Sequence, residues 1–461
     1  MYIDSVMRRS MLKLIITGLG LLLLSGCASY GVIDNTALTT ESSSAQPYSI
    51  KNLYGREGSG EIGLTLAFSG GGTRAAALSY GVLEELRDTT VVIDGQPRRL
   101  LDEIDTISSV SGGSFTSAYY GLFGEQIFED YKEVFLTKDV EHKLLRGMLN
   151  PFRWFGSETR TEMAVKLYEE QVFHGATFAD MQRAGAPLVL INASDLAYGV
   201  RFSFVQEYFD LLCSDLSTFP VARAVTASSA VPILFPPVVV KDYQDCAITG
   251  KPNWLEKSTE LTANNPALEQ IIQGLETYYD PENRQYAHLV DGGITDNLGL
   301  RAIYDVMELS GGPQSFYRKT NYGRHPRYAA VISVNASTDP VPEMNKTNKK
   351  PSFGEIIGSM SSVQLHRYND ATMQLMQQSM TEWTQALSTP DRPITAYFVK
   401  LGFTDITQPE DRNFFNAIPT SFSLTEEQVN RLIEAGHELL RNNPDYQRLL
   451  ADLGGAQVSN R

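Results

Sequence analysis

The stretch LTLAFSGGGTRAAALSYGVLEEL, residues 64–86, decides the fold of this chain. It opens as an apolar run of strand length and closes with apolar residues at helical spacing. Three glycines, Gly70, Gly71 and Gly72, stand between these two segments. Glycines expose backbone N–H groups without any Cβ in the way, and the start of the following helix adds its positive end. The stretch therefore predicts a strand-to-helix turn that holds an anion.

The rest of the chain repeats this alternation of short apolar runs and longer amphipathic stretches from residue 61 onward. Such a pattern predicts an α/β fold with a mainly parallel central sheet covered by helices on both faces. We expect a polar, irregular insertion at 241–284 and an added helical region after residue 337. The expected strands are 62–68, 104–110, 187–193, 202–205, 286–290, 328–334 and 394–401. The expected helices are 73–87, 112–123, 158–171, 221–229, 300–308, 353–387 and 425–441.

The first residues read as a targeting segment. Arg8, Arg9 and Lys13 precede an apolar run, 14–24, that is too short to span a bilayer. The sequence LSGC that ends at Cys27 resembles the lipobox of bacterial lipoprotein signal peptides. This resemblance implies a signal peptide over 1–26, lipidation of Cys27, and a place in the bacterial cell envelope, on the periplasmic side of the outer membrane. Residues 27–60 are rich in small polar residues and predict a flexible tether.

Charge and cysteine content limit the partners of the protein. The 461 residues carry a formal charge of −15, and removal of 1–26 takes away three basic residues and one acidic residue. This acidic balance argues against nucleic acid and against docking by a basic patch, so membrane contact is expected through the acyl anchor and apolar surface. Cys213 and Cys246 then remain, either as a disulfide or as two free thiols. The cysteines and the six histidines show no metal-ligand spacing, so no metal or cofactor is expected.

A second motif lies in IDTISSVSGGSFTSAYYGL, residues 104–122. A strand-like run ends at Ser111, and a helix of small residues follows. This is the layout of a nucleophile elbow, which presents a serine Oγ on a sharp turn at the top of a sheet. Ser109 stands where such elbows usually have glycine. Taken alone, a serine between a strand and glycines is more often the N-cap of the helix.

A third motif is YAHLVDGGITDNLGL, residues 286–300. It reads as a strand that ends in Asp291 and turns sharply at Gly292. Ligand sites of open α/β sheets gather at the carboxyl ends of strands, where Ser111 was also placed. None of the six histidines lies in such a motif, which makes Asp291 a candidate base. The alternative is an ordinary aspartate that begins a turn.

Together these motifs resemble the patatin-like phospholipase family. The segments SGGGTRA (69–75), SVSGG (109–113), VTASSAVPILFPPV (225–238) and VDGGITDN (290–297) match its oxyanion loop, nucleophile, proline segment and aspartate in order. Two positions depart from the family pattern: Ser69 replaces an aspartate and Ala75 replaces a glycine.

The resemblance covers roughly residues 61–300 and implies a patatin-like three-layer fold with a catalytic domain at 61–337. The sequence pattern beyond it predicts a mostly helical extension at 338–461 packed on that domain. It implies a lipid acyl hydrolase of phospholipase or lysophospholipase type whose substrate is a lipid ester. The implied site residues are the Ser111–Asp291 dyad, an oxyanion hole at Gly70, Gly71 and Gly72, and supporting residues Arg74, Gly113 and Gly292. Arg74 is expected to orient the loop or to meet a phosphate.

Two other hypotheses stay open on the sequence alone. One is an α/β-hydrolase esterase in which His437 or His366 acts as the base for Ser111. The other is a lipoprotein without catalytic activity that binds lipid in the cell envelope on the same fold. The residues that keep the second hypothesis open are Ser69, Ala75 and Ser109.

Overall fold

The computed structural model describes residues 30–39, 47–52, 58–139, 159–232, 234–243, 252–280, 282–319, 325–340 and 343–454. The chain divides into two compact units, Met1–Val32 and Ile33–Arg461, and all elements named below belong to the second. The predicted signal peptide and Cys27 lie outside the described residues. Among the helices that are described, none combines the length and the apolar character needed to cross a membrane.

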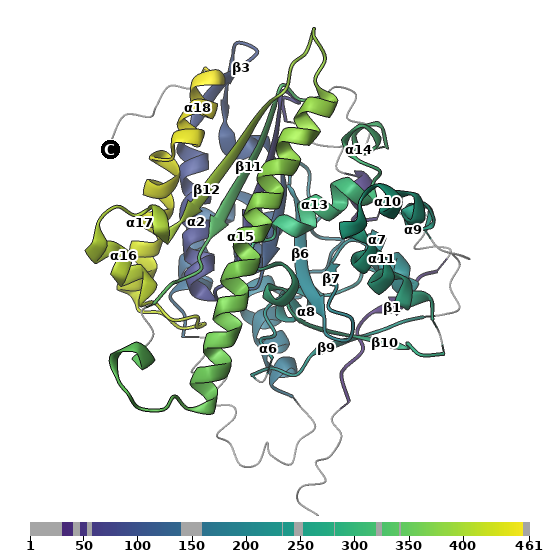
Figure 1. The fold of residues 1–461 in the computed structure, drawn as a ribbon, viewed down its shortest axis with the longest axis vertical. Coiled ribbons are helices and arrows are strands. Elements are labelled where there is room, and N and C mark those ends of the chain that lie inside the picture. The colour runs from purple at the N-terminus through teal and green to yellow at the C-terminus, as the bar shows by residue number, and fades with distance from the viewer. Residues whose placement is uncertain are drawn as a thin grey trace, which may run out of the picture. The chain divides into compact units, whose positions relative to one another are not determined.

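A mixed sheet forms the centre of the second unit (Figure 1). Among the described residues it has eight strands in the order β12-β11-β2-β5-β6-β10-β9, with β7 paired to β6. The five strands from β12 to β6 are parallel, whereas β7, β9 and β10 are antiparallel to their neighbours. The strands are β2 (Ile62–Phe68), β5 (Ile104–Val110), β6 (Leu188–Asp195), β7 (Arg201–Ser203), β9 (Val238–Lys241), β10 (Tyr286–Asp291), β11 (Tyr328–Asn335) and β12 (Thr395–Gly402).

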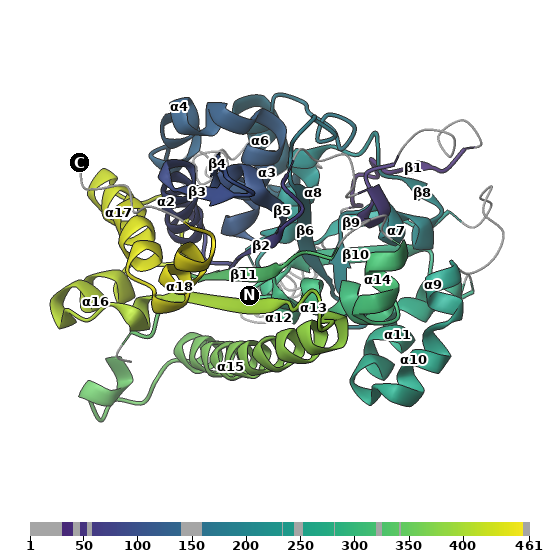
Figure 2. The same ribbon diagram turned by 90° about the horizontal axis from the view of Figure 1, so that it is seen from above.

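Helices cover both faces of this sheet (Figure 2). One layer contains α2 (Thr73–Asp88), α3 (Gly112–Phe123), α8 (Val221–Ser228), α17 (Glu426–Arg441) and α18 (Pro444–Asp452). The other contains α12 (Gly293–Asp296), α13 (Leu300–Leu309), α14 (Pro313–Lys319) and α15 (Phe353–Leu387). The remaining α-helices are α4 (Ile127–Tyr131), α6 (Arg160–Tyr168), α7 (Gln206–Phe209), α9 (Asn253–Glu256), α10 (Ser258–Asn264), α11 (Glu269–Glu276) and α16 (Pro409–Asn416).

The central strands are apolar because both of their faces are covered. Every residue of β6 is buried, and so are most residues of β2 and β5. Continuous apolar runs of this kind are typical of parallel sheets between helix layers. The α/β class and the helical C-terminal region predicted from the sequence are therefore confirmed.

Two parts of the chain differ from the sequence prediction. The insertion at 241–284 was expected to be irregular, but its described part contains α9, α10 and α11. Residues 27–60 were expected to be a flexible tether, but Asn35 and Tyr48 are buried. Asn35 donates to the Lys241 carbonyl at 2.8 Å, and the Tyr48 hydroxyl donates to the Val189 carbonyl at 3.1 Å. These buried polar contacts anchor the segment to the core despite its polar composition.

The sequence prediction also missed several short strands. A two-stranded hairpin, β3 (Thr90–Ile93) and β4 (Gln96–Arg99), follows α2. A short pair joins β1 (Thr36–Ala37) to β8 (Ser214–Asp215), and β9 continues the central sheet beside β10. Cys213, just before β8, is disulfide-bonded. Cys246 lies outside the described residues, so the Cys213–Cys246 pairing stays a prediction.

The C-terminal region does more than cover the sheet. It supplies the edge strand β12, which pairs with β11, and the helix α17, which packs on α2. The two helices meet at glycines: a Cβ on Gly81 would lie 2.1 Å from the Ile433 carbonyl oxygen, and one on Gly436 would lie 2.5 Å from the Leu78 carbonyl oxygen. Helix α2 begins at the end of the glycine turn, and its position is fixed by packing against α17.

Candidate active site

Ser111 lies on the sharp turn between β5 and α3. Its φ of 51° and ψ of −121° are unusual for a residue with a side chain, and such backbone conformations recur at nucleophile elbows. The Ser111 N–H donates to the Ser228 hydroxyl at 2.9 Å, and that hydroxyl donates to the Asn192 carbonyl at 2.6 Å. Ser228, the last residue of α8, thus links the turn to the neighbouring strand β6. No local pattern signals this role.

Ser109 fits into a buried group of hydroxyls beneath the turn. Its Oγ accepts hydrogen bonds from Ser117 at 2.6 Å and from Ser114 at 3.2 Å, and it donates to the Leu190 carbonyl at 3.3 Å. All of its hydrogen-bonding capacity is therefore used although the residue is fully buried. The serine that replaces the usual glycine is accommodated by its neighbours on α3.

Asp291 lies at the end of β10 and meets Ser111 directly. The Ser111 hydroxyl donates to Asp291 Oδ2 at 2.9 Å, and the Gly293 N–H donates to Oδ1 at 2.8 Å. The surrounding protein desolvates the carboxylate and raises its pKa to about 6, although the two hydrogen bonds partly oppose this rise. This hydrogen bond joins the two residues that were predicted from the sequence to form a dyad.

The strand that carries Asp291 runs opposite to the parallel strands. Asp291 pairs with Ala193 of β6. Val110, the last residue of β5, pairs with the preceding residue of β6, Asn192. Strand β10 pairs only with the last three residues of β6, which extend past β5. For this reason its carboxyl end reaches the same edge of the sheet as Ser111, even though β10 is antiparallel.

The three glycines of the turn have different surroundings. The Gly70 N–H donates to the Asn297 carbonyl at 2.9 Å, so this donor is already engaged. Gly71 and Gly72 have φ values of 141° and 61°, and within the described part of the chain their N–H groups have no recorded acceptor. A Cβ on Gly112, the first residue of α3, would lie 1.9 Å from the Gly72 carbonyl oxygen. The glycine turn and the Ser111 turn are thus in close backbone contact.

The other predicted supporting glycines also mark close approaches. A Cβ on Gly113 would lie 2.7 Å from the Phe68 Cβ, where α3 packs on β2. A Cβ on Gly292 would lie 2.3 Å from the Asn192 carbonyl oxygen, just after Asp291. Larger residues at either position would move the helix or the strand end that carries the site.

Arg74 is buried and bonded to neutral groups. Its Nε donates to the Ala336 carbonyl at 2.8 Å, its Nη1 to the Ile418 carbonyl at 2.6 Å, and its Nη2 to the Thr420 hydroxyl at 3.0 Å. Burial lowers its pKa to about 10, so the guanidinium stays charged at neutral pH. The structure records no carboxylate paired with it in the described ranges. These bonds favour the loop-orienting role over contact with a phosphate.

The C-terminal segment 418–421 forms a wall of the glycine turn. The Thr73 N–H donates to the Ser421 carbonyl at 2.9 Å, and a Cβ on Gly72 would lie 2.5 Å from that same oxygen. Nothing in the local sequence signalled this contact, because the two segments are separated by most of the chain. Ser69, which replaces the family aspartate, is fully buried and accepts the Ala336 N–H at 2.9 Å.

The histidines proposed as alternative bases have other surroundings. His437 Nε2 lies 3.0 Å from Glu84 Oε2 at the far end of α2. His366 lies half-buried on α15. Within the described residues, Asp291 is the recorded partner of the Ser111 hydroxyl, and no histidine is.

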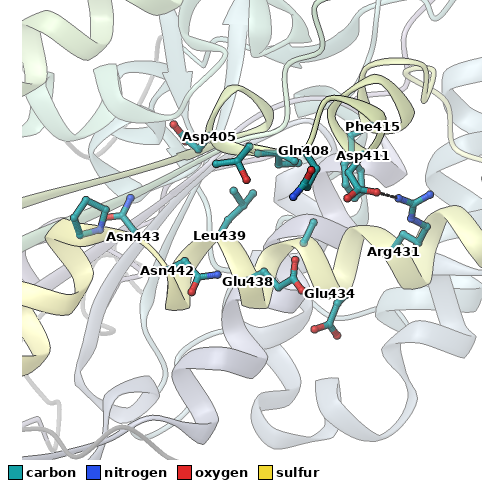
Figure 3. A pocket seen from close by; sticks show the side chains of 14 residues that line it. Asp405, Gln408, Asp411, Phe415, Arg431, Glu434, Glu438, Leu439, Asn442 and Asn443 are labelled. Carbon is teal, nitrogen blue, oxygen red and sulfur yellow. Dashed lines mark hydrogen bonds and ion pairs between the residues drawn. The ribbon is translucent and has the colours of Figure 1, made fainter. Parts of the chain in front are cut away.

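Three cavities in the described part of the chain lie away from Ser111, because Ser111 lines none of them. One, of about 760 Å³, lies between α17 and the segment before α16, and Figure 3 shows carboxylates around it together with the ion pair of Arg431 and Asp411 at 2.6 Å. Another is a smaller apolar cavity of about 120 Å³. Met376, Met380 and Trp383 line it together with residues from the amino ends of the strands. They are therefore remote from the edge that carries Ser111.

Comparison with known proteins identifies a family. The family model for patatin-like phospholipase matches residues 66–304, more than half of the chain. No curated protein matches the chain. Solved structures that resemble it include human GIVD cytosolic phospholipase A2 in complex with methyl gamma-linolenyl fluorophosphonate and terbium chloride, with a TM-score of 0.40, 12% identity, and coverage of 93% of this chain and 66% of that chain. The same human enzyme without these additions has a TM-score of 0.42 and 13% identity, with coverage of 93% and 68%.

The chain thus spans about two thirds of the length of that human phospholipase. The assignment rests on the family model, whose matched range includes the glycine turn, Ser111 and Asp291. The chain therefore belongs to the patatin-like phospholipase family.

Proposed function

We propose that the protein is a serine hydrolase that cleaves acyl esters of lipids through Ser111 and Asp291. The observation that carries this proposal is the 2.9 Å hydrogen bond from the Ser111 hydroxyl to Asp291 Oδ2, on a strained turn at the sheet edge. The match to the patatin-like phospholipase family supports a lipid ester as the substrate class.

In the first half of the reaction, Asp291 removes the proton of the Ser111 hydroxyl while Oγ attacks the ester carbonyl carbon. The carbonyl oxygen becomes an oxyanion. The N–H groups of Gly71 and Gly72, and that of Gly112 at the start of α3, are the proposed donors to it. The intermediate then collapses, the alcohol leaves with the proton held by Asp291, and the acyl group stays on Ser111 as an ester.

In the second half, a water molecule attacks the acyl-serine carbonyl. Asp291 takes a proton from this water and returns it to Ser111 Oγ as the fatty acid leaves. A carboxylate with a pKa near 6 is a stronger base than an ordinary aspartate. It is also ionised at neutral pH, so the rate of ester hydrolysis should rise with pH through about 6.

The identity of the base is tested by labelling the protein with a fluorophosphonate probe. We expect labelling of the full chain, loss of labelling in Ser111→Ala, and a drop of about 10³-fold or more in the labelling rate of Asp291→Asn. His366→Ala and His437→Ala serve as controls and should label at the wild-type rate. Loss of labelling in either histidine variant would favour the α/β-hydrolase hypothesis. A folded protein that does not label would favour the lipid-binding lipoprotein without catalytic activity.

The phospholipase or lysophospholipase subtype is tested with defined lipids. The products released from phosphatidylethanolamine and from its lysophospholipid are separated by mass spectrometry. Release of fatty acid from either substrate, absent with Ser111→Ala, would assign the substrate class. Cleavage of only short soluble esters would point to a different ester.

The cell-envelope location is a separate part of the proposal. It rests on the lipobox-like LSGC sequence that ends at Cys27. Metabolic labelling with an alkyne fatty acid should mark the wild-type protein in the envelope fraction and should fail to mark Cys27→Ala. Equal labelling of both proteins would contradict lipidation at this residue.

A further inference from the structure

The start of α15 has almost no packed face. Of the residues in 354–364 whose side chains are described, all are exposed except Ser359, which is half-buried. Ile356, Met360 and Val363 are exposed by 42%, 59% and 50%. Their spacing of four and three residues places them on one side of the helix, and we name these three residues the apolar stripe.

Basic residues flank the apolar stripe. Lys349 and Lys350 are exposed just before α15, and Arg367 is exposed one turn after Val363. The segment 343–368 contains four basic and two acidic residues, in a chain whose formal charge is −15. An apolar helix face bordered by lysine and arginine is the composition that binds anionic lipid surfaces. This local composition differs from the acidic balance of the whole chain, on which the expectation of no docking by a basic patch was based.

The apolar stripe projects from the edge of the sheet that carries Ser111. Because β11 and β12 are parallel and α15 connects them, α15 runs antiparallel to the strands and begins at their carboxyl edge. Figure 1 shows its first turns extending past α13, and Figure 2 shows α15 on the outer side of the sheet.

Hydrogen bonds link α15 to the glycine turn at the base of the stripe. Asn369 Nδ2 and Asn297 Nδ2 both donate to Ser337 Oγ, at 3.2 Å and 3.3 Å. The Asn297 carbonyl in turn accepts the Gly70 N–H. From Asn369, the stripe extends outward by about 20 Å at the helical rise per residue. Ile294 of α12, three residues after Asp291, is also 51% exposed, and α12 contacts α15.

We propose that the apolar stripe, together with Lys349 and Lys350, docks the protein on an anionic lipid bilayer with the Ser111 edge facing the membrane. The apolar side chains enter the headgroup boundary, and the lysines contact lipid phosphates. This inference rests on the proposed function, because docking brings Ser111 to its substrate only if the substrate is a membrane lipid. The contact is distinct from an acyl group on Cys27.

The first test places a fluorescent reporter in the apolar stripe. Full-length protein carrying Ser111→Ala, so that vesicle lipids stay intact, is given Met360→Trp and mixed with phosphatidylglycerol vesicles that contain brominated acyl chains. We expect quenching of the added tryptophan fluorescence by at least half. The matched control is Val92→Trp, because Val92 is 45% exposed on the β3–β4 hairpin. Both proteins carry the same N-terminus, so equal quenching at the two positions would overturn the proposal.

The second test concerns charge. In the same Ser111→Ala background, Lys349→Gln with Lys350→Gln should weaken binding to phosphatidylglycerol vesicles by roughly 30-fold and leave binding to phosphatidylcholine vesicles nearly unchanged. The control pair Lys166→Gln with Lys400→Gln removes two exposed lysines from other elements. Equal loss in the two pairs would contradict a role for this segment.

A second copy of the chain is the other candidate occupant of the apolar stripe. Sedimentation velocity over a range of protein concentrations detects it. Two results together would overturn the lipid assignment. They are a dimer that dissociates on Met360→Ser, and no quenching of the Met360→Trp variant by vesicles. Absence of ester hydrolysis by the wild-type protein, with stripe quenching retained, would instead overturn the proposed function alone.

Discussion

The carbonyl oxygen of Ser421 accepts a hydrogen bond from the Thr73 N–H at 2.9 Å, and this bond ties the C-terminal region to the first residue of α2. The same oxygen occupies the space in which a Gly72 side chain would lie. The shape of the glycine turn therefore depends on a residue near the other end of the chain.

Gly72→Ala should disable the proposed oxyanion site. Alanine adds a Cβ that would lie 2.5 Å from the Ser421 carbonyl oxygen, at a φ of 61° that disfavours any side chain. We expect kcat for ester hydrolysis to fall by about 10²–10³-fold. The control is Gly199→Ala, because Gly199 has a φ of 63° and open space around its Cβ position. Similar activity losses in both variants would show that the contact with Ser421 is unimportant.

Arg74→Lys should reduce kcat more than it changes KM. Lysine keeps the charge but cannot reach the three acceptors that the guanidinium reaches, so segment 418–421 loses much of its attachment to the turn. We expect a loss of at least tenfold in kcat. Thr420→Val removes only one of the three bonds and should cost less than tenfold. A rise in KM at constant kcat would indicate that Arg74 contacts the substrate instead.

Asp291→Asn should lose activity and yet be at least as stable as the wild type at pH 8. The pKa of Asp291 is raised to about 6 by desolvation, above the value of about 3.9 for an unfolded aspartate. A carboxyl whose pKa is raised on folding contributes stability at pH values below its pKa in the unfolded state. This contribution is lost as pH rises through its pKa in the folded state. Above pH 6 the buried charge therefore destabilises the wild type relative to the neutral asparagine.

Chemical denaturation at pH 4 and at pH 8 measures this difference. The gain in free energy of unfolding from Asp291→Asn should shrink or disappear at pH 4. The change in free energy of unfolding caused by Asp291→Asn is compared at the two pH values. If the variant is less favourable relative to the wild type at pH 8 than at pH 4, the assigned direction of the pKa shift is wrong.

Gly81→Ala should destabilise the protein although alanine is the better helix former. The new Cβ would lie 2.1 Å from the Ile433 carbonyl oxygen, so α2 and α17 must separate. We expect a loss of about 1–3 kcal/mol in the free energy of unfolding. Gly358→Ala, on an exposed turn of α15 with open space at the Cβ position, should instead gain about 0.5–1 kcal/mol. Equal effects at the two sites would exclude tight packing as the cause.

The local parts of the site could be predicted because each is a contiguous strand-to-helix or strand-to-turn motif. The end of β5, Ser111 and the start of α3 fall at the predicted residues, as do the bounds of α15. Proximity of Asp291 to Ser111 was also predicted. The antiparallel direction of β10 was not, because strand direction depends on pairing partners that hydrophobic periodicity does not reveal.

The long-range contacts could not be predicted from local patterns. Ser228, Asn297 and Ser421 hold the turns through backbone and hydroxyl groups, which residue type alone does not distinguish from ordinary loop residues. The burial of parts of residues 27–60, which were expected to form a flexible tether, could not be predicted for the same reason. Asn35 and Tyr48 are buried because β9 and β6 offer hydrogen-bond partners far away in sequence.

The attachment of Thr73 and Arg74 to residues 418–421 also sets an order of assembly. The glycine turn is translated before residues 418–421, which hold it in place, and more than 300 residues separate the two segments. A chain shortened by proteolysis or by a premature stop before residue 418 would lack this support. Such a fragment should therefore be inactive as an ester hydrolase.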